Sequence, residues 1–400
     1  MNLLGEKIQQ KAIYYLQKMR EIRREIHKFP ELSGSEKETA KRICHQLDLL
    51  NIPYQKDIAG YGIVALIQGE GIGKKNTIAL RADMDALPIL EQNTFDYKSV
   101  NKGVMHACGH DFHIASLLGT LMILNDLKTE WSGIVKAIFQ PSEEEYEGGA
   151  PFMINAGVLE NPQPQIILGL HADPDLKIGQ IGWHQGEFMA STDEIHIEII
   201  GKGGHAARPF ETINPLYIGA KILLRLEEEI TIPNAHKAPF VLNFGHFHAN
   251  GSTNIIPDKA VLLGTLRMFN EKLRPQIHQQ IHQIAKNEAA KHDATCNINI
   301  RLGYPMLYND PAITHQAVQA AQIFLGTKNT IEVPQRCTAE DFSYYLQHIP
   351  GCFLRIGVHN EAHGTTPKLH SAHFDADDEA LPTAAGFMAF FVYYYNKLSN

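Results

Sequence analysis

Patterns typical of strands and of helices alternate along residues 1–185, and this alternation constrains the fold more than any other feature of the sequence. Short apolar runs that predict strands lie at 62–68, 77–81, 134–139 and 165–170. Amphipathic patterns that predict helices cover 5–28, 112–127 and 149–156. Another helix is expected to open near Ser35, where Ser-Glu-Lys-Glu has the form of a capping box. Alternation of this kind predicts an α/β layer with a largely parallel sheet.

The segment 189–301 has a different order of elements. Strand and helix patterns follow one another there as β-α-β-β-α-β, at 195–199, 214–229, 240–247, 259–269, 271–291 and 296–302. This is the order of the ferredoxin-like unit. The alternating pattern returns after residue 303, with a helix near 311–325 and a strand near 352–356. We therefore expect an α/β domain formed by 1–188 and 302–400, with a mixed, largely parallel sheet flanked by helices, and an inserted α+β domain at 189–301.

Charge and hydropathy exclude several classes of protein. The 36 basic and 44 acidic residues give a net charge of −8 without any block of lysine and arginine, so we expect neither nucleic acid nor a membrane as a partner. The longest apolar stretch, 384–395, is too short to span a membrane, and residues 1–19 lack the apolar core of a signal peptide. We therefore expect a cytoplasmic protein. Its five scattered cysteines indicate no disulfide framework, so each is core filler, ligand or nucleophile.

Histidine is unusually frequent, with 21 residues, and some of these histidines lie beside a cysteine just before a predicted helix. Cys108 and His110 are two residues apart, so both side chains can reach one metal ion. The start of a helix also favours a thiolate. A buried cysteine beside solvent-facing histidines is the plainer interpretation of such a pair, but three histidines within 106–113 favour a metal site.

Further residues of the metal-binding type follow the predicted strands. They are Glu143–Glu145 after 134–139, His171 after 165–170, and Asp83 and Asp85 after 77–81. Open α/β sheets place their sites beyond the carboxyl ends of their strands. Adjacent carboxylates can divide the work, because one can bind a metal while the other acts as general base. An acidic run alone is usually a solvated loop, so the coincidence at several strand ends supports a site.

Two other segments carry candidates whose roles the residues alone leave open. The glycine-rich run 201–207 contains His205, and its glycines would let the backbone approach a ligand closely, although a plain turn fits equally well. It does not have the pattern of a phosphate loop. The segment 369–374 places His370 and His373 before the last helix, where a surface or core histidine is the simpler interpretation of either residue.

Nine motifs occur in one order across nearly the whole chain, and together they closely resemble those of the aminoacylase-like dinuclear metallopeptidases. They are RADMDALP (81–88), MHACGHD (105–111), FQPSEE (139–144), GLH (169–171), GKGGHAA (201–207), NIIPD (254–258), GTLR (264–267), AEDFS (339–343) and LHSAHFD (369–375). The nearest branch contains hippurate hydrolases, N-acyl-amino-acid amidohydrolases, N-acetyldiaminopimelate deacetylases and plant auxin–amino-acid conjugate hydrolases. The set is specific for the family and not for one member.

The resemblance implies a role for each of ten residues. The implied ligands of two neighbouring divalent metal ions are Cys108, His110, Glu144, His171 and His370. Glu143 resembles the general base, and Asp85 resembles the acid that orients the metal site. His205 resembles the histidine that reaches into the partner subunit's active site to stabilise the oxyanion. Asn254 and Arg267 match positions that hold the carboxylate or carbonyl of the substrate.

Two departures from the family pattern leave assignments open. The acidic run has three members, so the base and the ligand could be Glu143 and Glu144 or, shifted by one, Glu144 and Glu145. Alignment on the following segment, 148–150, favours the first pair. His171 is followed by Ala-Asp-Pro where the branch usually has an aromatic residue, and this leaves the acyl group of the substrate open.

The implied activity is hydrolysis of N-acyl-L-amino acids, or of small peptide-like substrates, by a metal-activated water. The inserted domain would act as a lid and would join two chains in a homodimer. A thiolate ligand favours zinc, with manganese, cobalt and nickel as alternatives. Two other functions stay open, namely a hydrolase with Cys108 as nucleophile and a protein that binds metal or amino acids without catalysis. Activity that survives a chelator would indicate the first, and metal binding without turnover the second.

Overall fold

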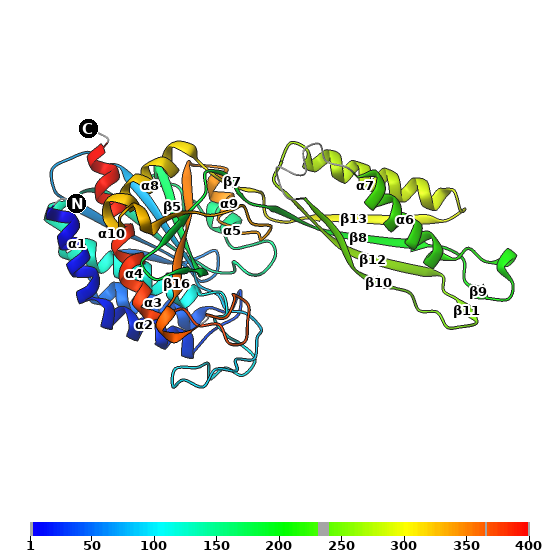
Figure 1. Ribbon diagram of the computed structural model, residues 1–400, viewed down its shortest axis with the longest axis horizontal. Coiled ribbons are helices and arrows are strands. Elements are labelled where there is room, and N and C mark those ends of the chain that lie inside the picture. The colour runs from blue at the N-terminus through cyan, green and yellow to red at the C-terminus, as the bar shows by residue number, and fades with distance from the viewer. Residues whose placement is uncertain (1–2, 231–239, 365, 399–400) are drawn as a thin grey trace. The chain divides into compact units, whose positions relative to one another are not determined.

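The computed structural model describes residues 3–230, 240–364 and 366–398, and the chain divides into two compact units (Figure 1). The larger unit contains Met1–Gly186, Tyr308–Pro334 and Asp341–Asn400, and the smaller unit contains Glu187–Leu307 and Gln335–Glu340. The second crossing between the units thus follows Leu307 rather than residue 301. The sequence patterns also gave no sign of the short return to the smaller unit at 335–340.

A mixed sheet forms the centre of the larger unit. Within the described residues it has eight strands in the spatial order β1 (Tyr54–Ile58), β2 (Gly62–Glu70), β4 (Ser132–Gln140), β3 (Thr77–Asp83), β5 (Ile166–Lys177), β16 (Gly351–His359), β6 (Ile181–Trp183) and β15 (Thr330–Glu332). The four neighbours β4, β3, β5 and β16 run parallel, whereas β1, β2 and β6 each have an antiparallel neighbour. The predicted mixed, largely parallel sheet is confirmed.

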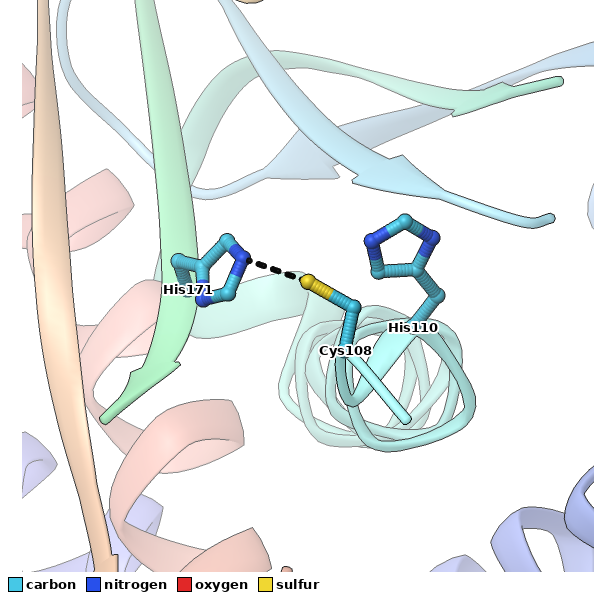
Figure 2. Close-up of side chains that lie close together, drawn as sticks. All are labelled: Cys108, His110 and His171. Atoms are coloured by element: carbon cyan, nitrogen blue, oxygen red, sulfur yellow. Dashed lines mark hydrogen bonds between the residues drawn. The ribbon is translucent and has the colours of Figure 1, made fainter. Parts of the chain in front are cut away.

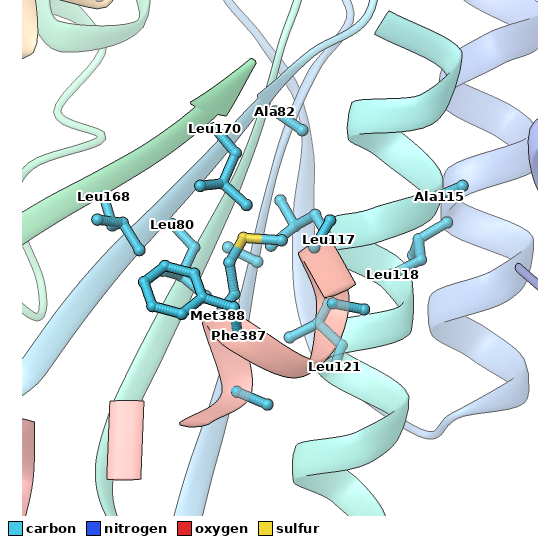
Figure 3. Packing of buried hydrophobic residues seen from close by; sticks show 14 of the residues in the cluster. Leu80, Ala82, Ala115, Leu117, Leu118, Leu121, Leu168, Leu170, Phe387 and Met388 are labelled. Carbon is cyan, nitrogen blue, oxygen red and sulfur yellow. The ribbon is translucent and has the colours of Figure 1, made fainter. Parts of the chain in front are cut away.

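Helices flank this sheet, and two of them contribute many buried residues to its core. The helices are α1 (Leu3–Tyr14), α2 (Leu16–Lys28), α3 (Lys37–Leu49), α4 (His110–Asp126), α5 (Ala150–Asn155), α8 (Pro311–Leu325), α9 (Ser343–Leu346) and α10 (Leu381–Leu398), with single 3₁₀ turns at Lys128–Glu130, Thr327–Asn329, Glu361–His363 and Asp378–Ala380. α4 and α10 are apolar on nearly every side, which is the pattern of a helix buried all round. Figure 3 shows leucine side chains of α4 and Phe387 and Met388 of α10 packed against Leu80 and Leu168 of the sheet. Among the described residues, no helix combines the length and apolar character needed to cross a membrane.

Two local predictions for the N-terminal segment were wrong. The single helix expected over 5–28 is divided at Tyr15, because α1 packs on α10 whereas α2 packs on α4. The capping box expected at Ser35 does not form. Glu31 caps α3 instead, since its carboxylate accepts hydrogen bonds from the backbone N–H groups of Glu38 and Thr39 at 3.2 and 2.7 Å. The side chain of Glu36 is buried and turns toward a different partner.

The smaller unit has the predicted β-α-β-β-α-β order. Its elements are β8 (Ser191–Ile200), α6 (Pro215–Glu229), β10 (Val241–His248), β12 (Lys259–Met268), α7 (Arg274–Ala290) and β13 (Thr295–Leu302), with short pieces β9 (Gly204–His205) and β11 (Ile255–Ile256) and a 3₁₀ turn at Pro209–Glu211. The short strands β7 (Gly186–Met189) and β14 (Leu307–Asn309) each include residues of both units. The strands pair in the antiparallel order β10-β12-β8-β13, as in ferredoxin-like units. Ile195, Ile197 and Ile199 of β8 are buried in one cluster with apolar residues of α6 and α7, because alternate strand residues face the same side.

Candidate metal centre

The residues predicted to bind metal in the larger unit gather around the start of α4. The chain enters α4 through Gly109, which has a φ of +88°, a conformation that favours glycine. This turn places Cys108 before the helix and His110 at its first residue, and both side chains are buried. Cys108 Sγ, a nitrogen of His110 and a nitrogen of His171 lie within 4.8 Å of one another.

Figure 2 shows the rings of His110 and His171 beside Cys108, and a hydrogen bond at Nδ1 fixes the orientation of each ring. His171 Nδ1 donates to the backbone carbonyl of Ala172 at 2.8 Å. Its Nε2 therefore carries no proton, and this atom lies 3.4 Å from Cys108 Sγ. His110 Nδ1 lies 3.2 Å from the Asp85 carboxylate, and its buried Nε2 makes no hydrogen bond with any described residue. A histidine held at one nitrogen by a carbonyl or carboxylate offers the other nitrogen to a metal.

His171 lies inside β5 and not beyond its end, contrary to the prediction that a strand over 165–170 stops before it. β5 continues because β16 stays paired with it, and Arg355 is the residue opposite His171. On the other side, the pairing of β3 with β5 ends at Gly169. Beyond Gly169, at this edge of β5, His113 Nε2 accepts a hydrogen bond from the Ala172 N–H at 2.8 Å.

A second group of possible ligand atoms shares Cys108 with the first. Cys108, Glu144 and His370 offer atoms within 4.8 Å of one another, and His370 Nε2 lies 3.3 Å from Glu144 Oε1. The backbone N–H of His370 donates to the Ala107 carbonyl at 2.8 Å, which attaches this C-terminal segment to the start of α4. All five predicted ligands therefore lie in two overlapping groups, as two adjacent cations that share one ligand would require.

The turn after β4 carries the paired glutamates, and Asp85 holds it. The two oxygens of Asp85 accept hydrogen bonds from the backbone N–H groups of Glu143 at 3.0 Å and Glu144 at 2.9 Å. Ser33 Oγ donates to the same carboxylate at 2.6 Å. Glu143 is buried, Glu144 is half-buried, and both lie near His110 Nε2, at 3.9 and 3.8 Å. Glu145 is exposed and belongs to none of the possible ligand groups among the described residues.

The electrostatics of this cluster fit a bound cation. Burial would lower the pKa of His110, but the carboxylates of Asp83 and Asp85 outweigh burial and raise it to about 10. Burial, and then the charges of Glu144 and Glu143, raise the pKa of the Cys108 thiol well above its usual range. The shift of His110, and the part of the Cys108 shift that comes from Glu144 and Glu143, report negative potential. A divalent cation would reverse this potential, since it favours the thiolate and the neutral imidazole. The donor set of sulfur, nitrogen and oxygen therefore fits divalent metal.

Sequence reasoning assigned no role to several residues that support this cluster. His113 donates through Nδ1 to Asp83 at 2.6 Å, and Arg81 pairs with the same carboxylate at 2.5 Å. Ser33 and Glu36 come from the loop before α3 and contact Asp85 and Ser142. Arg81 and Asp83 lie inside one recognised motif and His113 lies two residues after another, which is a weak signal. Nothing in the pattern of 33–36 points to the metal cluster.

The three other predicted site residues belong to the smaller unit. Its strands β9 and β11 pair His205 with Ile255, and the Ala206 N–H donates to the Asn254 carbonyl at 3.0 Å, so His205 and Asn254 are neighbours. Arg267 lies on β12, on the sheet face opposite the helices. It lines a groove of about 860 Å³ on that face.

Comparison with known proteins places these features in a family. Residues 79–394 match peptidase family M20/M25/M40. N-acetylcysteine deacetylase of Bacillus subtilis is 37% identical over 373 residues, which cover 92% of this chain and 94% of that protein. Thermostable carboxypeptidase 1 of Saccharolobus solfataricus is 35% identical over 368 residues, which cover 91% of this chain and 92% of that protein. The crystal structure of the Bacillus subtilis YXEP protein, a dinuclear metal binding peptidase, matches with a TM-score of 0.82 at 33% identity. The match covers 96% of this chain and 99% of that protein.

These matches confirm the predicted family and enzyme class: the chain belongs to peptidase family M20/M25/M40 and is a hydrolase of amide or peptide bonds.

Proposed function

We propose that this chain is a metal-dependent amidohydrolase that cleaves N-acyl-L-amino acids, or small peptide-like substrates, into a carboxylic acid and an amino acid. The observation that carries the proposal is the turn after β4. Its two adjacent carboxylates, Glu143 and Glu144, have their backbone N–H groups fixed by one buried aspartate, and both lie within 4 Å of His110. A protein that only binds a metal has no need of a second carboxylate held beside a ligand carboxylate.

Two divalent metal ions are the proposed cofactors. Cys108, His110 and His171 would hold one, and Cys108, Glu144 and His370 the other. Zinc suits the thiolate best, with manganese, cobalt or nickel as alternatives. When bound, such ions supply Lewis acidity, which lowers the pKa of a water and polarises the amide carbonyl.

The roles of the chain's own residues follow from their contacts. Glu143 is proposed as the general base that takes the proton of the attacking water and passes it to the departing amine. Asp85 keeps Glu143 and Glu144 in place through the two backbone hydrogen bonds. The exposure of Glu145 supports Glu143 and Glu144, rather than Glu144 and Glu145, as base and ligand.

The smaller unit is proposed to complete the site as a lid and dimerisation domain of a homodimer. His205 would donate to the oxyanion that forms in the partner subunit, and an exposed histidine on the short strand β9 suits that role. Loss of one such donor typically costs about 3–4 kcal/mol in the transition state. Arg267 would pair with the carboxylate of the substrate, and Asn254 would bind its carboxylate or carbonyl.

One contact favours a second candidate, a hydrolase that uses Cys108 as its nucleophile. Cys108 Sγ lies 3.4 Å from His171 Nε2, which resembles a cysteine–histidine pair. Its surroundings oppose this function, because burial and the charges of Glu144 and Glu143 raise the pKa of the thiol. Nucleophilic cysteines require the opposite shift.

A substrate panel tests the proposed function. The metal-loaded protein is assayed with acetyl, benzoyl, indoleacetyl and succinyl derivatives of several amino acids, and each substrate is paired with its C-terminal carboxamide as a control. We expect turnover of at least one acyl series, with kcat/KM about 10- to 100-fold lower for the carboxamide, which loses the charge-assisted bond to Arg267. Absence of turnover across the panel in folded, metal-loaded protein would contradict the proposal and would favour a non-catalytic binding protein.

A further inference from the structure

Three successive backbone N–H groups of the turn after β4 point at two buried carboxylates. Those of Glu143 and Glu144 donate to Asp85, and that of Ser142 donates to Glu36 Oε1 at 2.8 Å. Ser142 Oγ also donates to Glu36 Oε1, at 3.3 Å, and accepts a hydrogen bond from the Gly34 N–H at 2.9 Å. The loop before α3 is therefore hydrogen-bonded to Ser142, the residue that immediately precedes the paired glutamates.

The side chain of Glu36 is not explained by the stability of its own helix. Glu36 is the residue before α3, yet it makes no capping bond, and Glu31 satisfies the start of that helix instead. Glu36 is fully buried, and its Oε2 has no hydrogen bond among the described residues. Burial raises the pKa of its carboxyl to about 7. A buried carboxyl with one unsatisfied oxygen is costly, so its retention calls for a local role.

That role is to hold the backbone of Ser142, which is in an unfavourable conformation. Its φ is +58°, in the left-handed region that residues with a Cβ rarely adopt. Such conformations persist only where the surroundings hold them. From the other side, Gly149 lies so close that an added Cβ would be 1.8 Å from the Pro141 carbonyl oxygen. The turn is thus fixed between Glu36, Asp85 and the backbone at Gly149.

We propose that Glu36 is a positioning residue, whose carboxyl holds Ser142 in the left-handed conformation and thereby sets the direction of the Glu143 and Glu144 side chains. The catalytic part of this inference rests on the proposed function of those two glutamates. The structural part does not, since it concerns the hydrogen bonds of the turn itself. Glu36 touches neither the reacting atoms nor the five proposed ligands through any of the hydrogen bonds described above.

The test compares Glu36→Ala with Glu36→Gln, Glu36→Asp and the control Glu31→Ala. Glutamine keeps an acceptor oxygen at the same reach, whereas aspartate keeps the charge but is one methylene shorter. Glu31 is a glutamate of the same loop whose carboxylate also accepts backbone hydrogen bonds, but on α3. The first measurement is amide hydrogen exchange at residues 142–144 in metal-free protein, and the second is kcat and KM of metal-loaded protein.

We expect exchange at 142–144 to rise about 10- to 100-fold in Glu36→Ala and Glu36→Asp, as loss of a hydrogen bond to a buried carboxyl implies. Glu36→Gln should stay near the wild type, and Glu31→Ala should raise exchange in α3 alone. In the same two variants kcat should fall about 10- to 100-fold, because small displacements of catalytic groups are costly, while KM changes by less than about 3-fold. Glu36→Gln should restore kcat.

Two results would overturn the proposal. One is unchanged exchange at 142–144 in both Glu36→Ala and Glu36→Asp. The other is a loss of kcat that merely follows the folded fraction, as a purely structural residue would give. If Glu36→Ala does not fold, Glu36→Asp and Glu36→Gln still decide between these outcomes. Absence of wild-type turnover on every N-acyl amino acid would instead refute the proposed function, and the exchange measurement on metal-free protein would still decide the role of Glu36.

Discussion

Replacement of Glu143 by glutamine is expected to lower kcat by about 10²- to 10⁴-fold, the usual contribution of a general base. Glutamine has the shape of glutamate and keeps the backbone N–H that donates to Asp85, but it cannot take a proton from water. The metal content per chain should stay that of the wild type, because Glu143 is outside the five proposed ligands. The measurement is steady-state kinetics on the best N-acyl amino acid together with metal analysis of the same sample.

Neighbouring glutamates provide the matched controls for this prediction. Glu145→Gln changes an exposed side chain and should leave kcat within about 3-fold of the wild type, since surface groups outside the reacting centre contribute little. Glu144→Gln should instead lose bound metal, because Glu144 lies among the possible ligand atoms with Cys108 and His370. Full activity of Glu143→Gln, or loss of activity only in Glu145→Gln, would contradict the assignment of the base.

The same variant tests the proposed role of His205 in the partner subunit. Glu143→Gln chains mixed with His205→Ala chains should form mixed dimers that contain one intact site, so part of the activity should return. Either variant alone should stay inactive or weakly active. Mixed dimers that form, shown by mass spectrometry of intact complexes, but do not recover activity would contradict the sharing of His205 between chains.

Replacement of Arg23 by methionine is expected to lower the stability of the larger unit by about 3–5 kcal/mol, the usual cost of removing one partner from a buried ion cluster. Arg23 is buried in α2, and its guanidinium contacts the carboxylates of Asp111 at 2.9 Å, Asp378 at 2.8 Å, and Asp375. Methionine has a similar volume but leaves these carboxylates without their main cation. His27 compensates in part, since Asp111 and Glu91 outweigh its burial and raise its pKa to about 9.

The effect should extend to the metal cluster, because Arg23 joins the two segments that carry its ligands. Asp111 follows His110, and Asp375 follows the segment with His370. Loss of such supporting contacts typically lowers metal affinity about 10- to 100-fold. Chemical unfolding followed by hydrogen exchange in α2 and α4, together with competition for metal by a chromogenic chelator, measures both effects.

Arg20 offers a control on the same helix. Its ion pairs with Asp378 and Glu379 lie nearer the surface, with 26% of the Arg20 side chain exposed against 1% for Arg23. Arg20→Met should therefore cost less than about 1 kcal/mol, as surface ion pairs do. Equal losses of stability in the two variants would show that burial of the Arg23 cluster has no special effect.

Most elements of the fold and the candidates at strand ends were predictable because their signals are local, whereas the full set of five ligands, including His370, came from the resemblance to a family. Apolar periodicity marks β2, β3, β4 and α4, and strand ends in an α/β sheet collect functional side chains. Cys108 and His110 carried a metal-binding spacing of their own. The ferredoxin-like order of the smaller unit was likewise visible from alternation in β8 and β13 and from the Asn214-Pro215 start of α6.

The supporting residues were not predictable, because their partners are distant in the chain. Asp111 and Asp378 lie 88 and 355 positions from Arg23, so no window of sequence contains the cluster. At the loop before α3, the local pattern fits a capping box. Only the packing of the distant turn after β4 makes the Glu36 carboxyl accept a hydrogen bond from Ser142 instead. The same holds for His171, whose strand continues because β16 pairs beside it.

Metal dependence of amide hydrolysis tests the proposed function most directly. The protein is stripped with a chelator, and metal is returned in measured equivalents while turnover of an N-acyl amino acid is recorded. We expect no turnover in metal-free protein and full recovery at two equivalents per chain, the number that the two overlapping groups around Cys108 would hold. Undiminished turnover in protein shown to contain no metal would contradict the proposed function, and would point to the thiol of Cys108 as the nucleophile.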